Sequence, residues 1–222
     1  MIKAVFFDCD GVLVNSEQFD QSLNVDFIND YHLDIDPKVF YLWVGGSPSL
    51  NLWPVLYEKV ADKVDWTMEE FREKYRAHRK NNPRKLQFRE VMFEDVPRTL
   101  RYLKEEKGLL VACASSSSAD YIERALTECE IKQYFDLQVS GYDFQKSKPD
   151  PEIYLFCKDK FGLEPEECLV IEDSPYGIEA ALAAGIPVLA RRDTQFSMDQ
   201  SKATKIIDSL DEIRDFIEER EK

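Results

Sequence analysis

The chain has 222 residues, of which 44% are hydrophobic and 32% are charged, and its formal net charge at pH 7 is −14. This length and composition exclude an intrinsically disordered chain and allow either one domain or a core with an inserted smaller module. The acidic balance argues against general binding of nucleic acid, whose phosphates select basic surfaces, and an anionic substrate would need a metal ion and a few placed lysines or arginines.

The first predicted element is a buried strand at Ala4–Phe7, because these four apolar residues are too few for a helix and rich in strand formers. Asp8 and Asp10 follow, and on an extended backbone they point to one side while Cys9 points away. Gly11 then lets the chain leave the strand through a tight turn. Two adjacent carboxylates repel each other unless a cation or a shared proton offsets them, which favours a hard metal ion such as Mg²⁺. An isolated pair of this kind is more typical of a turn, and only the later motifs reverse that preference.

Residues 16–87 are predicted to form a helical insert, because nothing in this range has the pattern of a strand. Ser16 is the predicted N-cap of a first helix, whose shared face consists of Phe19, Leu23, Phe27 and Tyr31. A second helix is predicted over residues 50–64. A third is predicted from the capping box Thr67-Met68-Glu69-Glu70 to about Arg79, with a face formed by Met68, Phe71 and Tyr75. The insert is expected to end near Asn81-Asn82-Pro83.

Residues 88–222 alternate between helical patterns and short apolar runs, the first helix stopping before Gly108. The predicted strands are Leu109–Ala114, Leu137–Val139, Cys168–Ile171, Pro187–Ala190 and Lys205–Ile207. Continuous apolar strands that alternate with helices indicate a parallel sheet covered on both faces. The predicted fold is therefore α/β, a doubly wound parallel sheet formed by residues 1–15 and 88–222, with residues 16–87 as an inserted helical domain.

Three further polar stretches stand where predicted strands or loops meet helices, as is expected of functional groups at the carboxyl edge of a parallel sheet. Ser115-Ser116-Ser117-Ser118 follows the second strand, and its hydroxyls are suited either to donating to a phosphate or, as Ser117 with Asp120 suggests, to capping a helix. Lys148 stands before Pro149, which disfavours a helical Lys148, and Asp150 with Pro151 is predicted to begin the next helix.

The third stretch is Glu172-Asp173-Ser174-Pro175, after the fourth strand, with Gly177 in the helix that follows. Ser174 and Pro175 suffice to start that helix, so helix initiation does not account for the two acids. Carboxylates facing Asp8 and Asp10 across the sheet edge would complete an oxygen-rich metal site.

Other kinds of site are disfavoured. The chain has two histidines, His32 and His78, which are too few for a His-rich zinc site and disfavour a Ser-His-Asp catalytic triad. It has no glycine-rich nucleotide-binding motif. Five scattered cysteines and a start without a basic or long apolar segment favour the reducing cytoplasm, and no run is long enough to span a membrane.

These motifs, in this order, resemble those of the haloacid dehalogenase-like hydrolases, in particular the phosphatase branch that includes β-phosphoglucomutase and sugar-phosphate phosphatases. The resemblance covers essentially the whole chain. The matching segments are Asp8-Cys9-Asp10-Gly11-Val12-Leu13-Val14, the strand-end Ser115, Ser147-Lys148-Pro149-Asp150-Pro151, and Glu172-Asp173-Ser174 followed by Gly177-Ile178.

The resemblance implies a role for each matching residue. Asp8 would be the nucleophile that forms an aspartyl-phosphate, and Asp10 the general acid and then the general base. Ser115, Ser116 and Lys148 would bind the transferred phosphoryl group. The implied cofactor is Mg²⁺, held by Asp8, the Asp10 backbone carbonyl, Asp173 and Glu172, the last directly or through water. Residues 16–87 would be the mobile cap that selects the substrate, a small phosphorylated metabolite. We expect a monomer or weak homodimer with no nucleic-acid or membrane partner.

The chain departs from the family pattern in three places. Phosphomutase members grip a second phosphate with a lysine and an arginine of the cap, whereas Trp43–Ser49 contains neither, which favours a phosphatase. Cys9 stands where relatives more often have an aliphatic or aromatic residue, and it is predicted to be a small buried filler. Around Glu94-Asp95 the usual Pro-Gly is missing.

A basic stretch from Arg72 to Arg89 reverses the acidic balance locally. The simpler interpretation is a solvated helix face and hinge. The alternative is that some of these cations bind a second anionic group of the substrate, in which case charge reversal at Arg76 and Arg79 would raise KM most for a doubly anionic substrate.

The sequence therefore favours a Mg²⁺-dependent phosphatase of small phosphorylated metabolites, with sugar phosphates as the expected class. The alternatives are a phosphomutase and, in a different class, a phospho-accepting regulatory module. The pair of aspartates at the first strand and the large helical insert disfavour the regulatory module.

Overall fold

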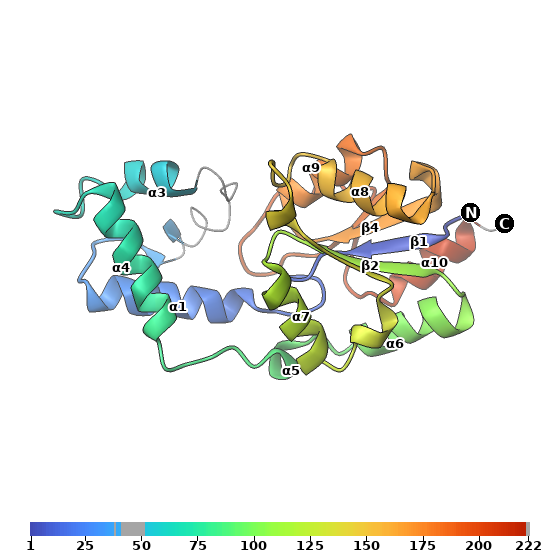
Figure 1. Cartoon of the computed structure of the whole chain (residues 1–222), viewed down its shortest axis with the longest axis horizontal. Coiled ribbons are helices and arrows are strands. Elements are labelled where there is room, and N and C mark those ends of the chain that lie inside the picture. Colours follow the sequence, from blue (N-terminus) through green and yellow to red (C-terminus); the bar gives the residue numbers. More distant parts are fainter. Residues whose placement is uncertain (38, 41–51, 221–222) are drawn as a thin grey trace. The chain divides into compact units, whose positions relative to one another are not determined.

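The computed structural model describes residues 1–37, 39–40 and 52–220. It divides into two compact units (Figure 1). The larger is formed by Met1–Asn15 and Gln87–Lys222, and the smaller by Ser16–Leu86.

The larger unit is built on a six-stranded, fully parallel sheet in the order β3-β2-β1-β4-β5-β6. The strands are β1 (Ala4–Phe7), β2 (Leu110–Ser115), β3 (Leu137–Ser140), β4 (Cys168–Glu172), β5 (Val188–Arg191) and β6 (Lys205–Ile207). The predicted doubly wound α/β sheet is thus confirmed. Strands β2 to β5 end one residue later than predicted, so Ser115 and Glu172 are the last residues of strands.

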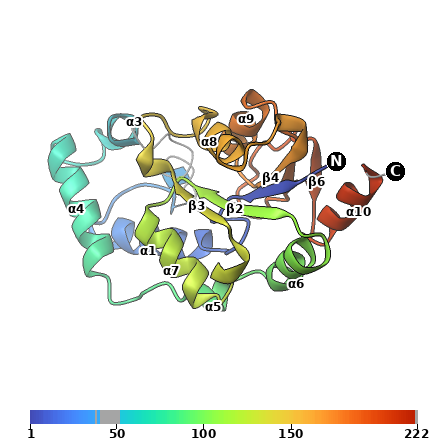
Figure 2. The ribbon, with the colours of Figure 1, turned by 45° about the vertical axis from the view of Figure 1, so that its right-hand side comes forward.

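Helices cover both faces of this sheet (Figures 1 and 2), α8 and α9 on one side and α6, α7 and α10 on the other. Their bounds are α5 (Phe88–Val91), α6 (Val96–Arg101), α7 (Ala119–Glu128), α8 (Glu152–Phe161), α9 (Pro175–Ala183) and α10 (Glu212–Glu219). A π-helical turn, Tyr102–Glu106, continues α6, and the chain then turns at Gly108, which has a φ of 66°. Short 3₁₀ turns lie at Lys132–Tyr134, Gly141–Asp143 and Pro165–Glu167.

Side chains along β1 alternate between the two layers of helices, as the pleat of a strand requires. Ala4 and Phe6 belong to the core packed with α8 and α9, whereas the ring of Phe7 on the opposite face meets Phe135 edge-on at 6.3 Å. Asp8 extends the alternation by one step, which directs its carboxylate toward the side of α8.

The smaller unit contains α1 (Glu17–Asp30), α3 (Leu52–Val60) and α4 (Met68–Asn81), and its described residues include no strand. Its core is a cluster of buried apolar and aromatic side chains: Phe27, Ile28, Ile35, Phe40, Leu56, Val60, Phe71 and Tyr75. Edge-to-face contacts of Phe27 with Phe71 and Tyr75 join α1 to α4, with ring centroids 5.8 and 5.2 Å apart.

The predicted helix starts of this unit are only partly correct. The capping box at Thr67 is confirmed, since its hydroxyl accepts from Glu70 N and its backbone N–H donates to Glu70 Oε2. Ser16 stands at the N-cap of α1, but its side chain makes no capping hydrogen bond. The spacing of Met68, Phe71 and Tyr75 predicts one shared face of α4; Phe71 and Tyr75 are buried, whereas Met68, in the first turn, is 37% exposed.

Candidate active site

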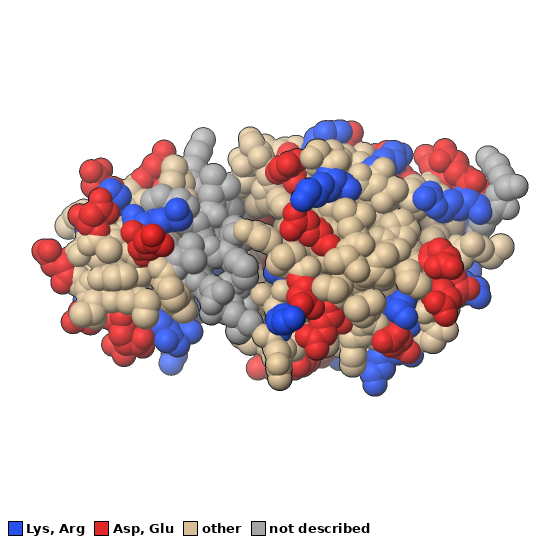
Figure 3. Space-filling model, turned by 90° about the horizontal axis from the view of Figure 1, so that it is seen from above, with Lys and Arg blue, Asp and Glu red and all other residues tan. Residues whose placement is uncertain are grey.

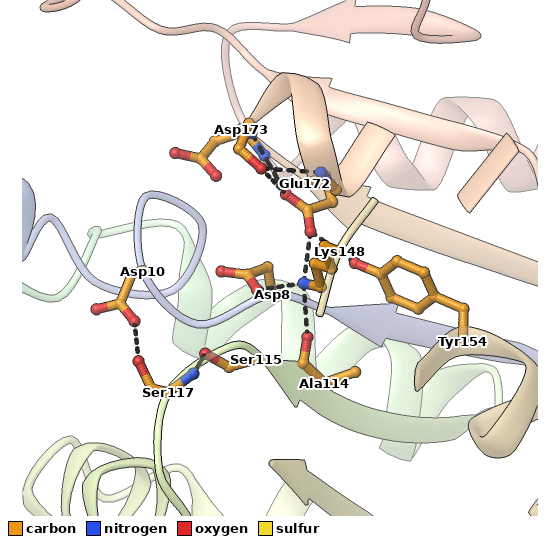
Figure 4. Close-up of polar contacts among 11 residues, drawn as sticks. Asp8, Asp10, Ala114, Ser115, Ser117, Lys148, Tyr154, Glu172 and Asp173 are labelled. Carbon is orange, nitrogen blue, oxygen red and sulfur yellow. Dashed lines mark hydrogen bonds and ion pairs between the residues drawn. The ribbon is translucent and has the colours of Figure 1, made fainter. Parts of the chain in front are cut away.

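Asp8 lies immediately after β1, where the carboxyl ends of the neighbouring strands converge (Figure 4). Its backbone N–H donates to the carbonyl of Ile171 on β4 at 2.9 Å, so the parallel pairing of the two strands fixes its position. Its Oδ1 accepts a hydrogen bond of 2.6 Å from Lys148 Nζ. Two motifs separated by most of the chain thus meet at one buried contact.

Lys148 is held on three sides by acceptors. Its ammonium donates to Asp8 Oδ1 at 2.6 Å, to Glu172 Oε1 at 2.6 Å and to the Ala114 carbonyl at 3.0 Å. Burial acts to lower the pKa of Lys148, but the carboxylates of Asp8 and Glu172 outweigh it and raise that pKa well above its ordinary value. The side chain is therefore a fixed cation placed against Asp8.

Burial has the opposite consequence for Asp8. It raises the pKa of the Asp8 carboxyl from 3.8 to about 7, because the opposing effect of Lys148 is only partial and the charges of Glu172 and Asp10 add to the increase. A carboxylate in this setting gains from any added positive charge, and that gain favours a bound cation.

Glu172, the last residue of β4, has both oxygens occupied by donors. Oε1 accepts from Lys148 and, at 2.6 Å, from the hydroxyl of the buried Tyr154 on α8. Oε2 accepts from the backbone N–H groups of Asp173 and Ser174 and from the Ser174 hydroxyl. Burial acts to raise the pKa of Glu172, but Lys148 and these hydrogen bonds hold it below its ordinary value, so the residue is an anion that orients Lys148.

The carboxylates of Asp8, Glu172 and Asp173 lie close enough to share a metal ion. All three are buried, and one oxygen from each lies within 4.8 Å of the others. Donors that are all oxygen and carry negative charge fit a hard divalent cation such as Mg²⁺. The Asp10 carboxylate is not among the three carboxylates of this cluster.

Two neighbouring positions keep Asp173 in this cluster. Gly11 has a φ of 75°, and a Cβ built there would lie 1.9 Å from Asp173 Oδ2, so only glycine permits the observed approach. Gln200 Nε2 donates to the Asp173 carbonyl and to the Arg191 carbonyl, both at 2.6 Å. Gly177 stands to Glu172 as Gly11 stands to Asp173, because a Cβ added at Gly177 would lie 1.8 Å from Glu172 Oε1.

The Asp10 carboxylate is turned toward α7. Oδ2 accepts from the Ser117 hydroxyl at 2.9 Å, and Oδ1 accepts from the Tyr121 hydroxyl at 2.6 Å. In Figure 4, Asp10 lies on the side of Asp8 away from Lys148. The two aspartates after β1 therefore have different environments: Asp8 faces a cation, and Asp10 faces two hydroxyl groups. The prediction that both side chains point to one side is wrong, because β1 ends at Phe7, before the two aspartates.

The serines after β2 divide into separate roles. Ser115 is buried at the end of β2, beside β1, and its Oγ accepts from Ser117 N at 3.1 Å. Ser116 is exposed. The prediction that Ser117 caps the next helix is wrong: Ser118 is the N-cap of α7, because it is the residue whose hydroxyl reaches the N–H three positions ahead, that of Tyr121. Ser117 is thereby left to donate to Asp10.

Two other helix starts were predicted near the site. Ser174 caps α9 and Pro175 opens it, as predicted. The prediction that Asp150 caps α8 with Pro151 as its first residue is wrong by one position. Pro151 is the N-cap, and Asp150 Oδ1 accepts from the N–H of Glu152 in the first turn.

The departures from the family pattern have partial structural explanations. Cys9 is fully buried, and its pKa is raised first by a hydrogen bond with Cys113 and then by burial, which suits an inert filler. Asp95 is also buried and accepts from Ser209 Oγ and Leu210 N at 2.9 Å and from Arg191. It thus joins the start of α6 to β5 and to the segment that precedes α10. The segment Trp43–Ser49 lies outside the described residues.

Four of the eight lysines and arginines in the basic stretch form ion pairs with acids in their own unit. Arg72 pairs with Glu69, Arg79 with Asp20, and Arg84 with Asp26 in the smaller unit, and Arg89 pairs with Glu130 in the larger. On the face shown in Figure 3, lysines and arginines stand beside acids in both units and form no continuous basic area. This arrangement favours the simpler interpretation, a solvated face, over an anion-binding surface.

Several contributing residues were missed from the sequence: Tyr121, Tyr154, Gln200 and the carbonyl of Ala114. The two tyrosines had a usable signal, since each stands in the first turn of a helix that directly follows a motif at the sheet edge. Gln200 had none, because it lies in an irregular segment far from every motif.

Comparison with known proteins adds to this geometry. A family model described as haloacid dehalogenase-like hydrolase matches residues 2–185. The phosphorylated carbohydrates phosphatase of Thermotoga maritima is 32% identical over 191 residues, which cover 83% of this chain and 82% of that protein. Hexitol phosphatase B of Escherichia coli K12 is 27% identical over 199 residues, covering 82% and 80%.

A crystal structure described as a putative β-phosphoglucomutase from Thermotoga maritima has the same fold, with a TM-score of 0.72 and 25% identity, and the match covers 98% of this chain and 99% of that one. Among the residues that the structure describes, no helix has the length and apolar character needed to cross a bilayer.

Proposed function

Because the chain belongs to the haloacid dehalogenase-like hydrolases and is a phosphatase of that family, we propose that it hydrolyses small phosphorylated metabolites, in particular sugar phosphates, in a Mg²⁺-dependent reaction. The observation that carries the proposal is the buried contact of 2.6 Å between Lys148 Nζ and Asp8 Oδ1, beside the carboxylates of Glu172 and Asp173. The similarity to phosphatases of phosphorylated carbohydrates and hexitols supports the choice of substrate class.

In the first step, an Asp8 carboxylate oxygen attacks phosphorus and the bond from phosphorus to the substrate oxygen breaks. The departing oxygen takes a proton from the Asp10 carboxyl group, and the phosphoryl group is left on Asp8. A carboxylate attacks a phosphate dianion poorly unless the charge between them is offset, and Lys148 offsets part of it. Ser115, Ser116 and Lys148 bind the non-bridging oxygens of the transferred phosphoryl group.

In the second step, water attacks the same phosphorus atom and gives its proton to Asp10, which is now ionised. The bond from phosphorus to Asp8 breaks, and inorganic phosphate leaves. Asp10 serves both steps because it gives up its proton in the first and regains one in the second. The enzyme returns to its starting state.

The residues proposed to hold Mg²⁺ are Asp8, Asp173, the Asp10 backbone carbonyl and Glu172, the last directly or through water. When bound, Mg²⁺ supplies positive charge that reduces the repulsion between the Asp8 carboxylate and the phosphate. Both oxygens of Glu172 already accept hydrogen bonds, so its main contribution is to orient Lys148. The smaller unit, residues 16–86, is proposed to act as the cap that selects the substrate.

The proposal is tested by assaying phosphate release from a panel of phosphorylated metabolites, with Mg²⁺ and with a chelator, for the wild type and Asp8→Asn. We expect metal-dependent release by the wild type and none by Asp8→Asn, because an amide cannot act as the nucleophile. Asp159→Asn is the control, since that side chain is 70% exposed on α8. A near wild-type rate for freshly purified Asp8→Asn would show that the nucleophile is assigned wrongly.

The same assay separates the alternatives. A requirement for a sugar bisphosphate, with transfer of phosphate within the substrate, would identify a phosphomutase. Stable phosphorylation of Asp8 without release of phosphate would identify a phospho-accepting regulatory module.

A further inference from the structure

Both oxygens of the Asp10 carboxylate accept hydrogen bonds from hydroxyl groups of one short segment. The Tyr121 hydroxyl donates at 2.6 Å and the Ser117 hydroxyl at 2.9 Å, from positions just inside and just before α7. Two donors on two oxygens fix both the position and the plane of a carboxylate, whereas one donor leaves it able to rotate.

The ring of Tyr121 is itself held from behind. Phe88, the first residue of α5 and fully buried, meets it edge-on with ring centroids 4.9 Å apart and planes at 87°. The Arg124 guanidinium lies over the Phe88 ring, 4.8 Å from its centroid. Edge-to-face packing of this kind restricts the swing of a side chain that carries a polar tip.

Glu128 ties these groups together. One oxygen accepts from Arg124 Nε at 2.6 Å, and the other accepts from the Phe88 backbone N–H at 3.2 Å. The tyrosine is thus fixed by a set of contacts that ends at the start of α5, where the chain returns to the larger unit.

We propose that Tyr121 is a positioning residue that holds the Asp10 carboxylate in place for the proton transfers of Asp10. The Tyr121 ring is in turn fixed by Phe88. This inference depends on the proposed function, in which Asp10 carries the proton of both steps. The Tyr121 hydroxyl donates to Asp10 and its ring packs against Phe88, so we expect its removal to change the steps that use Asp10 and to leave phosphate binding intact.

The test compares Tyr121→Phe, which keeps the ring and removes only the hydroxyl, with Tyr142→Phe. Tyr142 is 72% exposed on the same unit and outside the catalytic groups. We expect Tyr121→Phe to lower kcat by about tenfold, part of the roughly hundredfold or greater contribution of a general acid–base, and to change KM by less than about twofold. Tyr142→Phe is expected to match the wild type.

The same substitution is then made in Asp10→Asn, and the residual turnover of p-nitrophenyl phosphate is measured, since its leaving group departs without a proton. If Tyr121 acts through Asp10, the Tyr121→Phe substitution changes the residual rate of the Asp10→Asn variant by less than about 1.5-fold. A purely structural role would lower the rate equally in both backgrounds, and that result would overturn the proposal.

A second readout does not depend on activity. We expect Asp10→Asn to shift the NMR resonances of the Tyr121 ring, because the Tyr121 hydroxyl donates to the Asp10 carboxylate, and to leave those of the exposed Tyr142 in place. Unmoved Tyr121 resonances, or a wild-type kcat for Tyr121→Phe, would show that Tyr121 has no such role even if the enzyme is a phosphatase. Absence of phosphate release by the wild type would instead overturn the proposed function, and the role of Tyr121 with it.

Discussion

Lys148 donates a hydrogen bond of 2.6 Å to Asp8 although the two residues are 140 positions apart in the sequence. The contact is buried, and the same ammonium reaches Glu172 at the same distance. One cation therefore stabilises two carboxylates, one just after β1 and one at the end of the neighbouring strand β4.

Lys148→Met is expected to lower both stability and activity. The substitution leaves Asp8 and Glu172 buried without their cation, and removing one partner of a buried ion pair costs about 3–5 kcal/mol. Lys146→Met is the matched control, because Lys146 is 73% exposed and its pair with Asp150 spans 3.3 Å, an arrangement expected to contribute at most about 1 kcal/mol. Urea unfolding at neutral pH measures the stability of both variants. Equal losses of stability in Lys148→Met and Lys146→Met would contradict the role of Lys148 as the buried cation of Asp8 and Glu172.

The metal-free protein is expected to lose stability as the pH rises toward neutrality. Burial raises the pKa of Asp8 from 3.8 to about 7. Between pH 3.8 and about 7 the native state holds a proton on Asp8 that the unfolded chain has released. The protonated Asp8 therefore contributes stability that is complete below pH 3.8 and is lost as the pH rises through about 7. The slope is at most about 1.4 kcal/mol per pH unit for one group.

Asp8→Asn tests this dependence because the amide does not titrate. Urea unfolding with a chelator present, at about pH 5 and about pH 8, should show the variant gaining stability relative to the wild type at the higher pH. Asp159→Asn, on an exposed part of α8, should show no such change. A wild-type advantage that grows with pH would mean that Asp8 ionises more readily in the native state than in the unfolded chain.

The sheet and the meeting of the motifs were predictable from the sequence because both depend on local patterns. Apolar runs such as Ala4–Phe7 and Cys168–Ile171 have few alternatives to buried parallel strands, and the carboxyl ends of such strands share one edge. The placement of Asp8, Lys148 and Asp173 at that edge follows from chain order and strand pairing.

The hydrogen-bond partners were less predictable because they depend on rotations of single helices. A shift of one position in the cap of α7, from Ser117 to Ser118, changes which hydroxyl is available to Asp10. The pairing of Arg79 with Asp20 requires α1 and α4 to pack face to face, and no local pattern contains that information. The role of Asp95 is visible only once the fold brings it to its donors on β5 and in the segment before α10.

Gly11→Ala is expected to impair metal binding beyond its cost in backbone strain. The new Cβ would lie 1.9 Å from Asp173 Oδ2, so Asp173 would have to leave the carboxylate cluster. Gly108→Ala is the matched control: its φ of 66° is close to the 75° of Gly11, but nothing lies within 4 Å of an added Cβ. Both variants should lose about 1 kcal/mol of stability from the left-handed backbone.

Only Gly11→Ala should also weaken the binding of Mg²⁺, measured by calorimetry, by at least about tenfold, the scale of losing one oriented ligand. Phosphatase activity should then require a correspondingly higher Mg²⁺ concentration. Equal Mg²⁺ affinities in the two glycine variants would exclude Asp173 from the metal site.

Tyr154→Phe is expected to destabilise the protein through Glu172. The Tyr154 hydroxyl donates to Glu172 Oε1 at 2.6 Å, and burial raises the pKa of this tyrosine well above its ordinary value, so it stays protonated and remains a donor. Phenylalanine keeps the ring, over which Lys148 Nζ lies at 5.0 Å from the centroid, and removes only the hydrogen bond. A hydrogen bond to a buried charge contributes about 1.5–3 kcal/mol, which is the expected loss in urea unfolding at neutral pH.

Tyr142→Phe, at a side chain that is 72% exposed, should change stability by less than about 0.5 kcal/mol. If Tyr154→Phe were as stable as that control, Glu172 would not depend on the tyrosine for its position, and the orientation of Lys148 would have to come from Asp8 and the Ala114 carbonyl alone.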